Sequence, residues 1–226
     1  MSPAVRDPLP AALLVLTFVT GLVDAVSFLG LGRIFTANMT GNVVFLAFAV
    51  AGTPGLSIAR SLTSLLAFLA GAALEGRIGT VLGPDRRQWL LVAAAAEAGL
   101  LLAAAIVSVG FDVGSASPPG RLYGVIVLTA LAMGFRNATV RQLAVPDLTT
   151  TVLTLTLTAV AADSGLAGGR NTRLSRRIAA VAAMFAGAAL GALLVPEGLH
   201  WPLVVSGACV VVAIVACRRS AATESV

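Results

Sequence analysis

Six long apolar runs limit what this chain can fold into. They cover about residues 9–31, 57–76, 88–110, 121–142, 176–195 and 201–217 of a 226-residue chain. Each is close to the roughly 20 residues that an α-helix needs to cross a bilayer. Only 11% of the residues are charged, whereas soluble domains carry about 25%. The sequence therefore excludes a soluble globular fold and predicts one all-α integral membrane domain over residues 1–226.

The basic residues indicate topology rather than a nucleic-acid partner. All 15 are Arg, they give a net charge of +5, and they lie between the apolar runs. We therefore expect the lipid bilayer and a small-molecule solute as partners, and no nucleic acid. Cys209 and Cys217 fall in the last run without further thiols nearby, so no cofactor or metal is expected. The first run is longer than the 7–15-residue core of a signal peptide, which predicts a retained span.

Two shorter runs, about residues 39–52 and 148–162, decide the expected topology. About 14 or 15 residues is short for a spanning helix and suits a re-entrant segment. If all eight runs span, nine Arg fall inside and six outside. If the two short runs enter and leave on one side, only Arg33, Arg60 and Arg121 fall outside. The inside set is then Arg6, Arg77, Arg86, Arg87, Arg136, Arg141, Arg170, Arg173, Arg176, Arg177, Arg218 and Arg219.

The positive-inside rule favours the second arrangement. It predicts six transmembrane helices plus two short re-entrant helices. Both termini would lie in the cytoplasm, and the protein would be a multi-pass protein of the cytoplasmic membrane.

The two halves of the chain share four motifs in the same order. Gly21-Leu-Val-Asp24-Ala25 recurs as Gly134-Phe-Arg-Asn137-Ala138, and Asn38-Met-Thr40-Gly-Asn42-Val43 recurs as Asp147-Leu-Thr149-Thr-Thr151-Val152. Ala70-Gly-Ala-Ala-Leu74 recurs as Ala186-Gly-Ala-Ala-Leu190, and Trp89 matches Trp201. We interpret this as a duplication, with repeat 1 over about 9–110 and repeat 2 over about 121–218. Because each repeat would cross three times, the two would have inverted topology.

The first motif also carries a family resemblance. The stretch from Thr20-Gly-Leu-Val-Asp24-Ala through Phe35-Thr-Ala-Asn38-Met-Thr40-Gly-Asn42 resembles the signature of the YoaK-like bacterial membrane proteins, a family of unknown function. Gly134-Phe-Arg-Asn137-Ala is similar to that family's Gly-Met-Gln-Asn-Ala segment, with Phe135 and Arg136 departing from it. The resemblance covers essentially the whole chain and implies a polytopic inner-membrane protein, without a substrate or an activity.

Polar residues inside apolar runs are the first candidates for function. Asp24 lies in the first run, where an ionised carboxylate costs about 2.5–3.5 kcal/mol. It predicts a proton or cation site, or a hydrogen-bonding group on a solute path; the alternative is a structural carboxyl that holds a neighbouring helix. Asn137 occupies the matching position in the second half. Glu97 in the third run has the same two interpretations, and Cys209 stands at its equivalent position.

The starts of the two short runs form the second set of candidates, namely Asn38, Thr40, Asn42, Asp147, Thr149 and Thr151. Asn38 and Asp147 are favoured N-cap residues, so helix capping is one interpretation. In a re-entrant helix, the same N-terminus would also present its free N–H groups and partial positive charge near the membrane midplane. Thr151, Thr154 and Thr158 share one helix face. They could line a wet path or hydrogen-bond their own helix.

These features predict a membrane transporter of a small polar or anionic solute, with proton coupling through the buried carboxyls as an option. The alternatives are a passive small-solute channel and a non-transporting scaffold or sensor subunit. An enzyme is not expected, because His200 is the only histidine and no Lys is present. The Gly187-Ala-Ala-Leu-Gly191 match to GxxxG predicts close helix packing within one subunit, with a homo-oligomer interface as the second option.

Overall fold

The described part of the chain is helical in a computed structural model that describes residues 9–83, 85–144, 153–170 and 173–223. The helices are α1 (Leu9–Ala25), α2 (Met39–Val50), α3 (Ile58–Leu82), α4 (Arg86–Ser108), α5 (Pro119–Leu143), α6 (Leu153–Ala162), α7 (Leu174–Leu194) and α8 (His200–Thr223). A π-helical turn, η1 (Val26–Gly30), extends α1. Short 3-10 turns follow α6, η2 (Gly165–Ala167), and α7, η3 (Val195–Glu197). Each long apolar run is thus a helix, and the chain is an all-α membrane protein.

Helix lengths separate two groups of elements. Five helices are long and apolar enough to cross a membrane, namely α1 with η1, α3, α4, α5 and α7. The helix α8 has 24 residues, although its apolar part, His200–Ala216, is shorter. The helix α2 has 12 residues, 10 residues of α6 are described, and the two helices fall on the two short runs of the sequence. The helix α2 is too short to cross a hydrocarbon core of about 30 Å.

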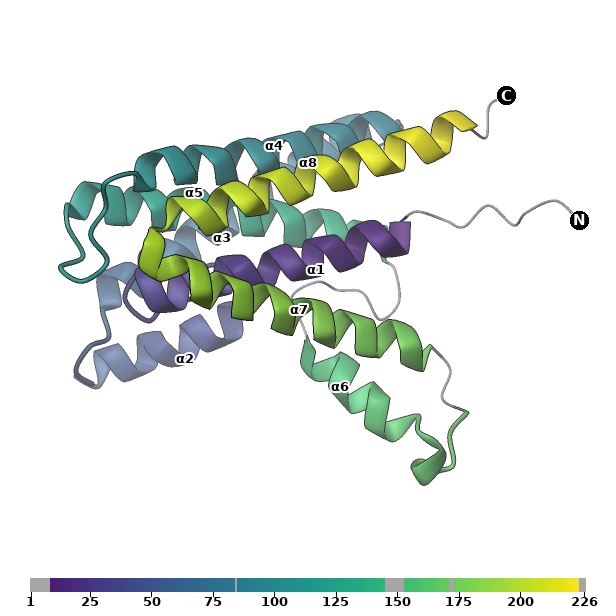
Figure 1. The fold of residues 1–226 in the computed structure, drawn as a ribbon, viewed down its shortest axis with the longest axis horizontal. Helices are drawn as coiled ribbons and strands as arrows, with labels where there is room; N and C mark the ends of the chain where they lie inside the picture. The colour runs from purple at the N-terminus through teal and green to yellow at the C-terminus, as the bar shows by residue number, and fades with distance from the viewer. Residues whose placement is uncertain (1–8, 84, 145–152, 171–172, 224–226) are drawn as a thin grey trace, which may run out of the picture.

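Two pairs of long helices form the most extensive contacts. The helices α1 and α7 pack side by side and are parallel to each other (Figure 1). The helices α3 and α5 also pack as a parallel pair, and this pair runs in the direction opposite to α1 and α7. The helix α4 packs on α5, α8 packs on α1, and α4 and α8 contact each other. When the labels α1 to α4 are exchanged for α5 to α8, this set of contacts maps onto itself.

Glycines bring each pair of backbones together. A Cβ at Gly21 would overlap with the carbonyl oxygen of Met184, and one at Gly187 would overlap with that of Phe18. In the other pair, a Cβ at Gly134 would overlap with the carbonyl oxygen of Phe68. The predicted close packing of the GxxxG motif within one subunit is therefore confirmed, because Gly187 and Gly191 both face α1.

The two short helices lie on one side of the bundle in Figure 1. The helix α2 packs on α3 and ends at the end of the bundle where α1 ends and α3 begins. The helix α6 packs on α7 and ends at the opposite end, where α7 begins. Each short helix therefore ends at the same end of the bundle as the long helix that precedes it in the chain.

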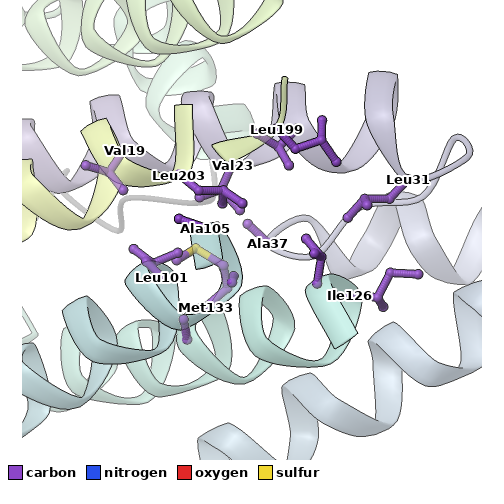
Figure 2. Packing of buried hydrophobic residues seen from close by; sticks show 14 of the residues in the cluster. Val19, Val23, Leu31, Ala37, Leu101, Ala105, Ile126, Met133, Leu199 and Leu203 are labelled. Carbon is purple, nitrogen blue, oxygen red and sulfur yellow. The ribbon is translucent and has the colours of Figure 1, made fainter. Parts of the chain in front are cut away.

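The space between α1, α4, α5 and α8 is filled by apolar side chains. Figure 2 shows this cluster, which includes Val19, Val23, Leu31, Ala37, Leu101, Ala105, Ile126, Met133, Leu199 and Leu203. Large apolar side chains also cover the outside, among them Ile106, Phe185 and Leu193, each 74% exposed. An apolar exterior of this kind is expected where helices contact lipid. The polar residues that are candidates for function therefore lie at isolated positions in an otherwise apolar bundle.

Candidate functional site

A buried ion pair joins α4 and α5. Arg136 is 1% exposed and Glu97 is 3% exposed. The Nε of Arg136 donates a hydrogen bond to Oε1 of Glu97 over 2.8 Å, and its Nη2 pairs with the same oxygen. An unpaired charge inside a membrane protein is costly. The opposite charges of Arg136 and Glu97 offset this cost for each other.

The same guanidinium also binds α1. Its Nη1 donates to the Leu16 carbonyl oxygen over 2.8 Å and to the Thr20 hydroxyl oxygen over 2.9 Å. All three nitrogens of Arg136 thus have partners, on two different helices. The arrangement ties α1, α4 and α5 together at one level and leaves the guanidinium little capacity to bind an additional anion.

Asp24 lies one helical turn beyond Thr20 on α1, just before the π-helical turn, and is 9% exposed. The backbone N–H of Ala37 interacts with its carboxyl group, and the Arg136 charge acts on it through space. Its Oδ1, however, is buried without a hydrogen-bond partner among the residues that the structure describes. A buried acceptor of this kind costs about 1–3 kcal/mol when it stays unsatisfied. Asp24 therefore has an open position for a proton or for a donor group.

The loop that carries Ala37 is held against α3. The Asn42 amide accepts a hydrogen bond from the Phe35 N–H and donates one to the Ser61 carbonyl oxygen, each over 3.3 Å. The Ser64 hydroxyl donates to the Phe35 carbonyl oxygen over 2.7 Å. The next side chain, Thr36, is fully buried and its hydroxyl has no partner. Asn42, predicted as a site residue, thus positions the loop beside Asp24.

The start of α2 behaves as predicted for a helix cap. The side chain of Asn38 accepts a hydrogen bond from the Gly41 N–H over 3.2 Å, so the capping interpretation is confirmed. Asn38 and Thr40 are both exposed and do not contact Asp24 through any hydrogen bond in the described residues. The matching predictions at Asp147, Thr149 and Thr151 lie outside the residues that the structure describes. In α6, Thr158 donates to the Thr154 carbonyl, as expected for back-bonding.

The second half differs from the first at the position that matches Asp24. Asn137 donates to the Met133 carbonyl oxygen of its own helix over 2.8 Å. Its neighbour Arg136 reaches α1 and α4 instead. Arg136, counted above among the Arg on the inner side, does not lie at the membrane surface, because its side chain is buried within α5. The available signal was its place inside the apolar run 121–142, where an Arg needs a carboxylate partner.

A comparison with known proteins places this chain among membrane proteins. The profile of the DUF1275 family, described as proteins of unknown function, matches residues 12–216. The chain belongs to the DUF1275 family. It is 32% identical over 152 residues to the UPF0700 transmembrane protein YoaK of Bacillus subtilis (strain 168). That match covers 66% of this chain and 64% of the relative. The predicted resemblance is thus confirmed, and no solved structure matches.

Proposed function

We propose that this DUF1275 protein is a secondary transporter of a small polar solute, and that Asp24 couples transport to proton movement. The observation that carries this proposal is the buried Oδ1 of Asp24, which has no hydrogen-bond partner. It lies beside the loop that leads into the short helix α2. Polar groups beside interrupted helices are where transporters of this kind bind solutes and coupling ions.

The arrangement of helices supports two repeats of inverted topology. The parallel pair α1 and α7 corresponds, after exchange of the halves, to the parallel pair α5 and α3, which runs in the opposite direction. Gly21 and Gly134, which the motif comparison aligns, occupy the same position in the two pairs. In this proposal α2 and α6 are re-entrant, six helices span the inner membrane and both termini are cytoplasmic.

The charges of the site favour a neutral or cationic solute over an anionic one. Glu97 neutralises Arg136, and the remaining guanidinium donors bind Leu16 and Thr20. The atom of this site without a hydrogen-bond partner among the described residues is an acceptor, the Asp24 Oδ1. Buried carboxyls within membrane helices form proton relays in pumps and transporters, and a carboxyl with an open acceptor oxygen can take up and release a proton in the course of a transport cycle.

A non-transporting scaffold or sensor subunit is the second candidate. The apolar packing between α1, α4, α5 and α8 in Figure 2 favours it, because a solute path through this space would have to open. We propose transport ahead of it because packing alone would not require an unpaired carboxyl oxygen in α1. In neither case do we propose an enzyme.

Asp24→Asn tests the proposal. Purified protein in liposomes that enclose a pH-sensitive dye is challenged with a panel of neutral and cationic metabolites under a pH gradient. We expect the wild type to move protons with at least one solute, and Asp24→Asn to insert and fold but to lose this pH-dependent uptake. Asp24→Leu should also lower stability, because it removes the hydrogen bond to the loop.

Asp112→Asn is the matched control, since Asp112 is a carboxylate in the exposed loop between α4 and α5. It should leave uptake unchanged. Uptake by Asp24→Asn with an unaltered pH dependence would make Asp24 a structural carboxyl and favour a passive channel. Absence of uptake for the whole panel, with intact proteoliposomes, would favour the scaffold.

A further inference from the structure

A second buried carboxyl, Glu75 of α3, lies away from the site at Asp24. Its side chain is 0% exposed. Its Oε1 accepts a hydrogen bond from the indole N–H of Trp89 on α4 over 2.7 Å, and its Oε2 accepts one from the amide of Gln142 on α5 over 3.1 Å. Both donors are neutral. No cation pairs with Glu75 among the residues that the structure describes, in contrast to Glu97.

From this geometry we propose that Glu75 is a proton-binding site, one that serves the transport cycle from the end of the bundle where α3 ends. The carboxylate takes a proton from hydronium, giving the carboxylic acid and water, and returns it in the reverse step. This inference rests on the proposed function for its role in transport. The binding of the proton itself is a separate property that can be measured without a substrate.

The partners of Glu75 can satisfy both of its protonation states. The Trp89 indole is a donor only. Its hydrogen bond can be accepted by the Glu75 carboxylate and also by the carbonyl oxygen of the protonated carboxyl group. The Gln142 amide carries both a donor and an acceptor. Its nitrogen donates to the carboxylate, and after a half-turn of the amide its oxygen accepts from the carboxylic acid. Proton gain or loss therefore leaves no buried group unpaired, which would otherwise cost the site its stability.

Protons can reach Glu75 through its partner on α5. Gln142 is exposed and lies next to the last residue of α5, whereas Trp89 is 5% exposed and closes the other side. Glu75 is thus one hydrogen bond from the surface. The other charged residues on the three helices around it are Arg60 and Arg77 on α3, Arg86, Arg87 and Glu97 on α4, and Arg121, Arg136 and Arg141 on α5, and Asp85 caps the start of α4.

The position of Glu75 along the bundle relates it to Asp24. Glu97 follows Trp89 by eight residues on α4, and Arg136 precedes Gln142 by six on α5, which separates the two clusters by about 9–12 Å along the axis. Asp24 lies about 6 Å further along α1 from Thr20, the residue that Arg136 contacts. Glu75, the Arg136–Glu97 pair and Asp24 therefore follow one another along the bundle. Glu75, seven residues before the end of α3, is the one nearest the end of the bundle where α4 begins.

Tryptophan fluorescence gives a direct test, because the chain has only two Trp residues. Trp201 is 52% exposed and is replaced in a Trp201→Phe background, which leaves Trp89 as the reporter. We expect the Trp89 emission of the protein in lipid nanodiscs to change with pH as one proton binds, and Glu75→Gln to lose this change. Glu197→Gln, at an exposed carboxyl, is the matched control and should keep it.

Infrared spectra of the same protein provide the second measurement. They should show a carboxylic-acid band that rises as the pH falls and that Glu75→Gln removes. If Glu75→Gln does not fold, the wild-type Trp89 emission decides alone, because Asp24 can also contribute a carboxylic-acid band. Constant Trp89 emission, or a band that Glu75→Gln leaves unchanged, would overturn the inference and make Glu75 a permanently charged structural acceptor. A titration in a protein whose uptake is independent of pH would leave this proton site standing and refute the proposed coupling.

Discussion

Removal of Glu97 should be among the most damaging single changes in this protein. Glu97→Leu leaves the Arg136 guanidinium buried at 1% exposure without its carboxylate. Arg136 keeps its hydrogen bonds to Leu16 and Thr20, but it loses those from Nε and Nη2. An uncompensated buried charge costs about 3–5 kcal/mol. Individual polar contacts between transmembrane helices average only about 0.6 kcal/mol, so the charge and not the hydrogen bonds sets the magnitude.

The double variant Glu97→Leu/Arg136→Met should recover most of this loss. It removes both charges, and apolar replacement of a buried pair is often neutral or stabilising by about 1–4 kcal/mol. The Leu16 carbonyl also stays satisfied, because the Thr20 hydroxyl donates to it over 3.0 Å. We therefore expect the double variant to be more stable than either single variant, with a coupling energy of about 3 kcal/mol.

The assay is reversible unfolding in mixed detergent and lipid micelles, followed by tryptophan fluorescence. Glu197→Gln serves as the control at an exposed carboxyl and should change the free energy of unfolding by less than about 0.5 kcal/mol. The reasoning fails if Glu97→Leu costs less than about 1 kcal/mol, or if the double variant loses as much as both single variants together.

Two further predictions test the packing and the topology. Gly21→Ala should destabilise the protein by about 1–3 kcal/mol by overpacking, because its Cβ would overlap with the Met184 backbone, whereas Gly76→Ala, with nothing within 4 Å, should be neutral or slightly stabilising in the same unfolding assay. Single Cys reporters at Ser57 and Ser117, in a Cys-free background, should react with an impermeant thiol reagent from outside, and one at Ser164 should react only after permeabilisation. A reporter at Ser57 that labels only from the cytoplasm would favour eight spans over two re-entrant helices.

Local sequence patterns were enough to predict the helices and their caps. The six long runs and two short runs all fall on helices, since an apolar segment enters a helical state in lipid whatever its neighbours are. The Asn38 cap bonds only three residues along the chain, so its hydrogen bond could be foreseen. The burial of Asp24 also followed from its place inside an apolar run of the sequence.

The partners of the buried polar groups could not be foreseen in the same way. Arg136 binds residues 39, 116 and 120 positions away, and a count of Arg on either side of the membrane contains no information on where a side chain points. Glu75 lies inside the apolar run 57–76, which is the same signal as for Asp24 and Glu97, but its two donors come from other helices and could not be foreseen.

The sequence by itself determined that the chain is a helical membrane protein, because transfer of an apolar run into lipid depends only on its length and composition. Which helix faces which was decided only by the tertiary structure. The close approaches at Gly21 and Gly134 fix the rotation and register of the long helices, and these set which polar side chains meet. Glu97 therefore acquires a cation, Glu75 acquires two neutral donors, and Asp24 keeps one oxygen open.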